Sequence, residues 1–348
     1  MYTFTRRTAV LGSAALAAAV ALSGCSKAAT DSGSAGSGSS GAAGQPLNVV
    51  FIPKNLGNPY FDASDAGGKS AVEELGGKYS QVGPQTASPD AQVQYINTAA
   101  QQHVSAIVIS ANDPKAIGDA LTQAKQAGTK VVTFDSDTDP QYRDLFVNQA
   151  SAAGIAKAQV DGLAKQIGDE GEIAILSASA NATNQNAWID LMKKELAASH
   201  PKMKLVDTVY GNDDDQTSFD KTSALLQTHP NLKGIISPTT VGVSAAARYL
   251  STSDKKGKVA LTGLGTPNQM REYVKNGTVQ EFYLWNPTDL GYLAAYTAAA
   301  LANGQITGKE GDTFKAGKLG DYKVGANGEV LLGDPTAFNS DNIDQFKF

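Results

Sequence analysis

Short apolar runs alternate along the chain with longer segments in which apolar residues recur every three or four positions. The runs occupy residues 47–52, 106–110, 130–134, 172–176, 234–237 and 259–262, and helical spacing marks residues 91–103, 116–126, 154–167 and 218–228. Runs that are apolar at every position are typical of parallel strands covered by helices on both faces. The alternation therefore predicts an α/β fold with parallel sheets and right-handed crossovers.

The number of apolar runs predicts two sheets rather than one. About five strands are expected before residue 150 and about five after it, which is many for one open sheet. A chain of 348 residues also has the length of two domains. We expect two doubly wound parallel-sheet lobes joined by a hinge, an N-terminal lobe of residues 47–150 and 285–310 and a C-terminal lobe of residues 151–284 and 311–348. We expect the chain to cross between the lobes near residues 149–151, 282–286 and 310–320. Several short crossings would favour a hinge motion that closes the lobes over free tumbling of one lobe against the other.

The N-terminal segment has the pattern of an export signal. Arg6 and Arg7 precede an apolar stretch at residues 9–22, which is too short to span a bilayer core of about 30 Å as a helix. We expect residues 1–24 to be a signal peptide. The paired arginines leave both the twin-arginine and the general export route open.

A single cysteine follows this segment. Leu22-Ser23-Gly24-Cys25 resembles the lipobox of bacterial lipoproteins, in which the cysteine is acylated. Two or three acyl chains on Cys25 would anchor the chain durably in a membrane. Residues 26–46 are mostly Ser, Gly and Ala and predict a flexible tether. We therefore expect an extracytoplasmic protein, anchored to the outer face of the cell membrane.

Charge and missing motifs exclude several classes of function. Loss of residues 1–24 removes two arginines and changes the formal charge from −5 to −7, which disfavours nucleic acid as a partner.

Gly68-Lys69-Ser70 lacks the first glycine of a phosphate-binding loop, because Ala63 stands there. Pro140 and Phe146 break the calcium-loop spacing of the aspartates at 135, 137 and 139. The three histidines are far apart in sequence, so no enzyme, metal site or cofactor is expected.

Polar and aromatic residues follow the predicted strands. In doubly wound sheets, ligands bind at the carboxyl ends of the strands. Carboxylates, amides and a lysine can bond sugar hydroxyls, and aromatic rings can cover the apolar faces of a sugar. Some of these residues have an alternative, purely structural explanation. Helix capping would account for Asn112, Asp113 and Asp289, and packing in the core would account for Trp285. Lys54 has no capping role, since a helix N-terminus disfavours a cation.

The order of these segments over residues 47–348 resembles the periplasmic binding proteins of the ribose-type cluster, which have the type I fold. Asn58-Pro59-Tyr60-Phe61 is similar to the Asn-Pro-aromatic-aromatic entrance of that family. Its rhamnose-binding and autoinducer-2-binding members are the most similar. Residues 182–186 and 285–292 resemble the rhamnose-binding group, whereas residues 338–344 resemble the autoinducer-2 group.

The resemblance implies a ligand site and its specificity. Lys54, Asp135, Gln185 and Pro238 match ligand positions of the autoinducer-2 group, but Asn184 replaces an aspartate and Thr240 replaces an alanine. The expected ligand is therefore L-rhamnose, with autoinducer-2 or another pentose or deoxysugar as the alternative. Together with the residues after the strands, the expected ligand-binding set is Lys54, Asn58, Phe61, Asn112, Asp135, Asn184, Gln185, Pro238, Thr240, Trp285 and Asp289.

The resemblance also implies partners. A monomeric protein would capture the sugar and deliver it to the permease subunits of an ABC transporter, with no cofactor or metal. A sugar-responsive transcription regulator has the same two-lobed fold, but it needs a helix-turn-helix where this chain has the export signal and the tether. A receptor subunit that passes ligand to a chemoreceptor or kinase stays open as an added role.

Overall fold

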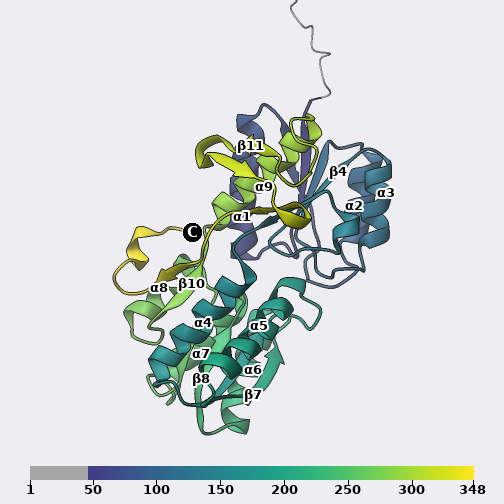
Figure 1. The fold of residues 1–348 in the computed structure, drawn as a ribbon. Coiled ribbons are helices and arrows are strands. Elements are labelled where there is room, and N and C mark those ends of the chain that lie inside the picture. The colour runs from purple at the N-terminus through teal and green to yellow at the C-terminus, as the bar shows by residue number, and fades with distance from the viewer. Residues whose placement is uncertain (1–45) are drawn as a thin grey trace, which may run out of the picture. The chain divides into compact units, whose positions relative to one another are not determined.

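A computed structural model describes residues 46–348, which form two lobes, each built on a parallel sheet (Figure 1). The expected signal peptide, Cys25 and nearly all of the tether lie outside the described residues. Within residues 46–348, no helix combines the length and the apolar character that crossing a bilayer requires. The predicted fold class, parallel α/β in two lobes, is confirmed.

The first lobe contains a sheet with helices on both faces. Its strand order is β13-β5-β4-β3-β1-β2, and all of its pairs are parallel. Alternate residues of β1 explain the layers, because Val49 and Phe51 pack toward α1 and α9, whereas Val50 and Ile52 pack toward α2 and α3. The elements are β1 Asn48–Ile52, α1 Pro59–Glu74, β2 Lys78–Gln81, α2 Val93–Gln101, β3 Ala106–Ile109, α3 Gly118–Gln126, β4 Lys130–Phe134, β5 Leu145–Asn148, α9 Pro287–Ala302 and β13 Glu329–Leu331.

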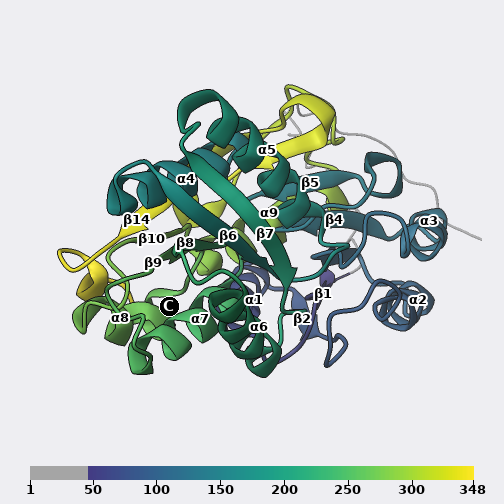
Figure 2. The same ribbon diagram turned by 90° about the horizontal axis from the view of Figure 1, so that it is seen from below.

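The second lobe repeats this arrangement with a sheet of order β7-β6-β8-β9. Figure 2 shows α4 and α5 on one side of this sheet and α6 and α7 on the other. The elements are α4 Ala152–Ile167, β6 Gly171–Ser177, α5 Thr183–Ser199, β7 Met203–Tyr210, α6 Asp215–Thr228, β8 Leu232–Ser237, α7 Thr240–Thr252, β9 Ala260–Gly263 and α8 Pro267–Lys275.

The chain crosses between the lobes between β5 and α4, and again between β10 (Phe282–Leu284) and α9. The C-terminal segment then returns along both lobes, as the yellow ribbon in Figure 1 shows. After a hairpin of β11 (Thr313–Lys315) and β12 (Asp321–Lys323), β13 joins the first sheet beside β5. Next, β14 (Thr336–Phe338) pairs with β10.

This return path corrects one expectation. The expectation that all of residues 311–348 belong to the C-terminal lobe is wrong for β13, which is a strand of the first sheet. The β11–β12 hairpin also packs against α9 of the first lobe. The third crossing therefore lies between β13 and β14, not at residues 310–320. Short strands at a sheet edge are set by pairing with a distant segment, which the local pattern does not record.

Candidate ligand-binding site

A cavity lies where the carboxyl ends of the two sheets face each other. Most of its lining residues directly follow strands or open helices, which is where ligands bind in open α/β sheets. The cavity has about 360 Å³ of space, including its opening to solvent. Its lining is Lys54, Asn58, Tyr60, Phe61, Asp135, Asn184, Gln185, Trp188, Asp213, Pro238, Thr239, Thr240, Leu264, Leu284 and Trp285.

Asp135 is the buried carboxylate of the first lobe. It follows β4 with a left-handed backbone, φ 60°, a conformation that Asp tolerates better than most residues. Its carboxylate accepts hydrogen bonds from Ser110 Oγ at 2.7 Å and from Tyr60 OH at 3.0 Å. Burial raises the pKa of Asp135, an effect that the positive charge of Lys54 and these two donors partly offset. The site therefore holds a strong acceptor in a fixed position.

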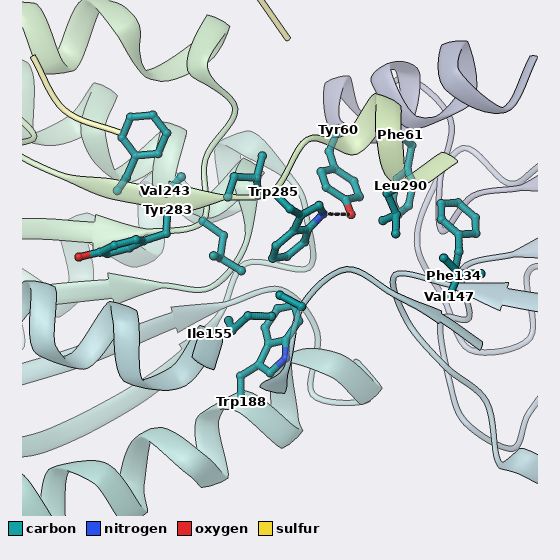
Figure 3. Close-up of a cluster of buried hydrophobic side chains, with 14 of the residues drawn as sticks. Tyr60, Phe61, Phe134, Val147, Ile155, Trp188, Val243, Tyr283, Trp285 and Leu290 are labelled. Atoms are coloured by element: carbon teal, nitrogen blue, oxygen red, sulfur yellow. Dashed lines mark hydrogen bonds between the residues drawn. The ribbon is translucent and has the colours of Figure 1, made fainter. Parts of the chain in front are cut away.

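An aromatic wall adjoins this carboxylate. Trp285 Nε1 donates to Tyr60 OH at 2.9 Å, and the same hydroxyl donates to Asp135. Figure 3 shows Trp285 between Tyr60 and Trp188, with this hydrogen bond dashed. Both pairs are edge-to-face, with ring centroids 6.1 Å apart. Since the indole N–H is already bonded within the protein, Trp285 offers the cavity an apolar surface.

Lys54 and Asn184 connect the lobes across the cavity. Lys54 Nζ donates to Asn184 Oδ1 at 3.1 Å, and Asn184 Nδ2 donates to the Asp135 carbonyl oxygen at 3.3 Å. Lys54 is only 4% exposed. Both the oxygen and the nitrogen of the Asn184 side-chain amide therefore form hydrogen bonds with residues of the first lobe. A carboxylate at this position has no N–H with which to make the second contact.

Gln185 supplies a free acceptor. Its side chain is buried, and within residues 46–348 its Oε1 has no hydrogen-bond partner. Leaving such a group unsatisfied costs about 1–3 kcal/mol. A ligand hydroxyl that donates to Oε1 would recover this free energy on binding.

Asp213 is a cavity residue that sequence analysis missed. It follows β7 and has a φ of 50°, beside Asn212 with a φ of 56°. Its carboxylate accepts a hydrogen bond of 2.5 Å from Thr239 Oγ1. Burial raises the pKa of Asp213, and Lys54 in the other lobe opposes that shift. Two adjacent non-glycine residues in the left-handed region are uncommon and cluster at functional sites.

The structure brings most of the predicted site residues together. Nine of them line the cavity: Lys54, Asn58, Phe61, Asp135, Asn184, Gln185, Pro238, Thr240 and Trp285. Asn58 has two roles, because its Oδ1 also caps α1 by accepting from Tyr60 N at 3.1 Å.

Asn112 and Asp289 are absent from the cavity lining, contrary to expectation. Asn112 Nδ2 donates to the Lys54 carbonyl oxygen at 2.9 Å, so Asn112 holds the backbone of a cavity residue. Asp289 lies in the first turn of α9, where it accepts from Asn286 Nδ2 at 2.8 Å and pairs with Lys318 at 3.3 Å. A carboxylate is stabilised there by the helix dipole.

One cluster of possible metal ligands lies away from the cavity. Asp161, Glu195 and His200 bring potential ligand atoms within 4.8 Å of one another. The Lys157 ammonium lies between the two acids, 2.8 Å from Asp161 and 3.2 Å from Glu195. A protein cation therefore already balances this cluster.

Two α/β lobes with a polar cavity between them are typical of two-lobed solute-binding proteins, which close around their ligands by a hinge motion. The family model of the periplasmic binding protein domain matches residues 49–306. The chain belongs to this family, whose members are substrate-binding proteins of transporters, and it is not an enzyme. Membership implies a location outside the cytoplasm.

Solved structures give more detailed likenesses. A sugar ABC transporter protein from Actinomyces odontolyticus is 52% identical, with a TM-score of 0.71, over 87% of this chain and 98% of that one. A solute-binding protein from Clostridium phytofermentas with bound L-rhamnose is 41% identical, with a TM-score of 0.84 and the same coverages. LsrB from Clostridium saccharobutylicum, in complex with AI-2, is 28% identical, with a TM-score of 0.83, over 87% of this chain and 100% of that one.

Proposed function

We propose that this protein captures a neutral monosaccharide, L-rhamnose, and delivers it to the permease of an ABC transporter. The observation that carries the proposal is the composition of the interlobe cavity. Lys54, Asp135 and Gln185 offer donors and acceptors, while Trp188 and Trp285 offer an apolar wall. A 6-deoxyhexose needs both, because it has hydroxyls on its ring and a methyl group in place of a hydroxymethyl group.

Two observations favour rhamnose over autoinducer-2. The relative with bound L-rhamnose is 41% identical, whereas the AI-2 complex is 28% identical. In addition, Asn184 replaces the aspartate of the autoinducer-2 motif and uses its amide N–H toward the Asp135 carbonyl oxygen. A site that hydrogen-bonds its ligand rejects analogues that leave buried polar groups unpaired.

We assign the nine predicted residues that line the cavity to ligand binding and add Tyr60 and Asp213. Asp135 and Asp213 would accept from hydroxyls, and Lys54 would donate. One lysine beside two carboxylates leaves no surplus of positive charge to attract an anionic sugar. This balance supports a neutral ligand.

Autoinducer-2 is the second candidate. Lys54, Asp135, Gln185 and Pro238, the four positions shared with that group, all line the cavity. Only Asn184 and Thr240 depart from its motif.

We further propose that the chain is a monomer held at the outer face of the cell membrane by a lipid on Cys25. The support is the lipobox-like Leu22-Ser23-Gly24-Cys25 and the tether that follows it. Metabolic labelling with a radioactive fatty acid tests this, since a Cys25→Ser chain should take up no label.

Thermal unfolding with a panel of ligands tests the sugar proposal. The compact unit Gly44–Phe348 is heated with L-rhamnose, D-ribose, D-arabinose and autoinducer-2. A ligand at 100 times its dissociation constant adds about 2.7 kcal/mol to the free energy of unfolding. We expect the largest rise in melting temperature with L-rhamnose. A rise with autoinducer-2 alone would support the second candidate, and no rise with any of the four ligands would contradict both.

A further inference from the structure

A second hollow opens at the mouth of the cleft, next to the deep cavity. It has about 670 Å³ of space, including the solvent that opens into it. Both lobes line it, and it shares Asn58 and Asp213 with the deep cavity. The two hollows therefore adjoin each other at these two side chains.

The hollow has the chemistry of the deep cavity without its lysine or its aromatic wall. Amide and hydroxyl side chains line it from both lobes, with Asn55 and Gln85 on one side and Ser244 and Gln269 on the other. The Asn55 Oδ1 atom is buried and has no hydrogen-bond partner within the described part of the chain. Such a surface offers donors and acceptors to hydroxyl groups.

The acidic residues at the hollow do not make it a cation site. Asp214 accepts from Thr217 N at 2.7 Å and caps α6, and Asp215 bonds Arg248 at 2.5 Å. Asp213, the third, is fixed by Thr239 at the boundary of the two hollows. A neutral polyhydroxyl group fits this surface better than a metal ion does.

We propose that the mouth is a second sugar subsite, so that the cleft binds a neutral disaccharide or glycoside with one ring in the deep cavity and the next ring at the mouth. This inference rests on the proposed sugar-binding function and extends it from a single ring to two. Asp213 would contact both rings, because its carboxylate is the only one that lines both hollows among the described residues.

Titration calorimetry on the full-length chain tests this subsite with three probes: L-rhamnose, methyl α-L-rhamnoside and a disaccharide of two α-linked L-rhamnose units. We expect the disaccharide to bind at least tenfold tighter than the methyl glycoside. Equal dissociation constants for the two, or binding of L-rhamnose without the disaccharide, would overturn the subsite and leave the proposed function standing. Failure of all three probes to bind would overturn both.

Two variants locate the effect. Ser244 lies in α7 and lines the hollow, so that Ser244→Met places a larger side chain there. It should weaken disaccharide binding at least tenfold and change L-rhamnose binding by less than about twofold. Ser70→Met, at an exposed position of α1, is the matched control and should change the binding of neither ligand.

Gln85 is exposed on a loop, so Gln85→Ala should weaken the binding of the disaccharide alone and leave the fold undisturbed. Equal losses for both ligands, or no loss in either variant, would overturn the proposal.

Discussion

Asn184 uses its whole amide group to connect the two lobes. Its oxygen accepts from Lys54, and its nitrogen donates to the backbone of Asp135. Aspartate has nearly the same shape but brings an acceptor where the structure has a donor. It would also add a third carboxylate to a site where burial already raises the pKa values of Asp135 and Asp213.

Asn184→Asp should therefore weaken L-rhamnose binding by at least about fivefold, since leaving a buried group unpaired costs about 1–3 kcal/mol and about 1.4 kcal/mol corresponds to tenfold. Calorimetric titration of both chains measures the change. Asn186→Asp is a matched control two residues away, outside the cavity, where Nδ2 bonds the Ala180 carbonyl oxygen. If Asn184→Asp bound rhamnose and autoinducer-2 as the parent chain does, this account of specificity would be wrong.

Asp65 is a second unusual carboxylate, on α1 and outside the cavity. The pKa of Asp65 is raised to about 7, chiefly by burial and next by the negative charge of Asp62, whereas the positive charge of Lys69 lowers it. Its Oδ1 has no partner in the described residues. The folded chain therefore holds this proton more tightly than the unfolded chain, whose Asp titrates near 3.8.

The sign of the pH effect follows from this difference. Where the folded state binds more protons, the free energy of unfolding falls as pH rises, here between about 4 and about 7. Urea unfolding at pH 5 and pH 8 should show Asp65→Asn losing less stability over this interval than the parent chain. Asp90→Asn, at an exposed loop position, is the control. An equal loss in the parent and Asp65→Asn chains would refute the assignment.

At the scale of elements, α1 and α9 are in backbone contact through glycines. A Cβ atom on Gly291 would lie 1.8 Å from the Ser64 carbonyl oxygen, and one on Gly67 would lie 1.8 Å from the Thr288 carbonyl oxygen. Glycine is needed here for the close approach of two helices, since neither position has a positive φ. This packing covers one face of the first sheet and fixes the start of α9, which follows Trp285 of the cavity.

Gly291→Ala should lower the free energy of unfolding by at least about 1–3 kcal/mol, the usual cost of overpacking. Chemical denaturation measures it. Gly154→Ala in α4 is the control, because the added methyl group meets only the Ser151 hydroxyl oxygen. That variant should be near neutral, because the advantage of about 1 kcal/mol that alanine has over glycine in a helix offsets the shift required of the Ser151 hydroxyl, 2.8 Å from the added Cβ. A loss in Gly291→Ala no larger than in Gly154→Ala would contradict the close contact.

At the scale of the whole molecule, hydrogen bonds across the cavity connect the two lobes. Lys54 carries the positive charge that offsets the buried carboxylates of Asp135 in its own lobe and Asp213 in the other. Domain closure around ligands is a hinge motion, and a ligand shifts it only by its differential affinity for the two states. We therefore expect Lys54 to contribute to closure as well as to binding.

Lys54→Met should shift the ligand-free chain toward an open form, because it leaves two buried carboxylates without their cation. Small-angle X-ray scattering should then show a larger radius of gyration than for the parent chain. Lys204→Met, at an exposed position of the edge strand β7, is the control. Identical scattering from the Lys54→Met and parent chains would mean that Lys54 does not stabilise closure.

The sequence by itself determined the strand-helix alternation and most of the cavity. The two-sided burial of β1, β3 and β4 makes these strands apolar at nearly every position, so the pattern marks them within a residue or two. Because ligand sites in such sheets lie just beyond the ends of the strands, the position of Lys54 and Asp135 at the cavity was predictable from local order alone.

Only the tertiary structure decided the rest. β7 is a partly exposed edge strand with no continuous apolar run, so Asp213 at its end gave no local signal. Tyr60 and Phe61 are adjacent aromatics, and only the contacts with Asp135 and Trp285 show that the Tyr60 hydroxyl connects carboxylate and aromatic wall. Asn112 looks like a ligand residue but bonds the backbone of Lys54 instead. Which polar group reaches a cavity depends on partners far apart in the chain, and these are set by packing rather than by local pattern.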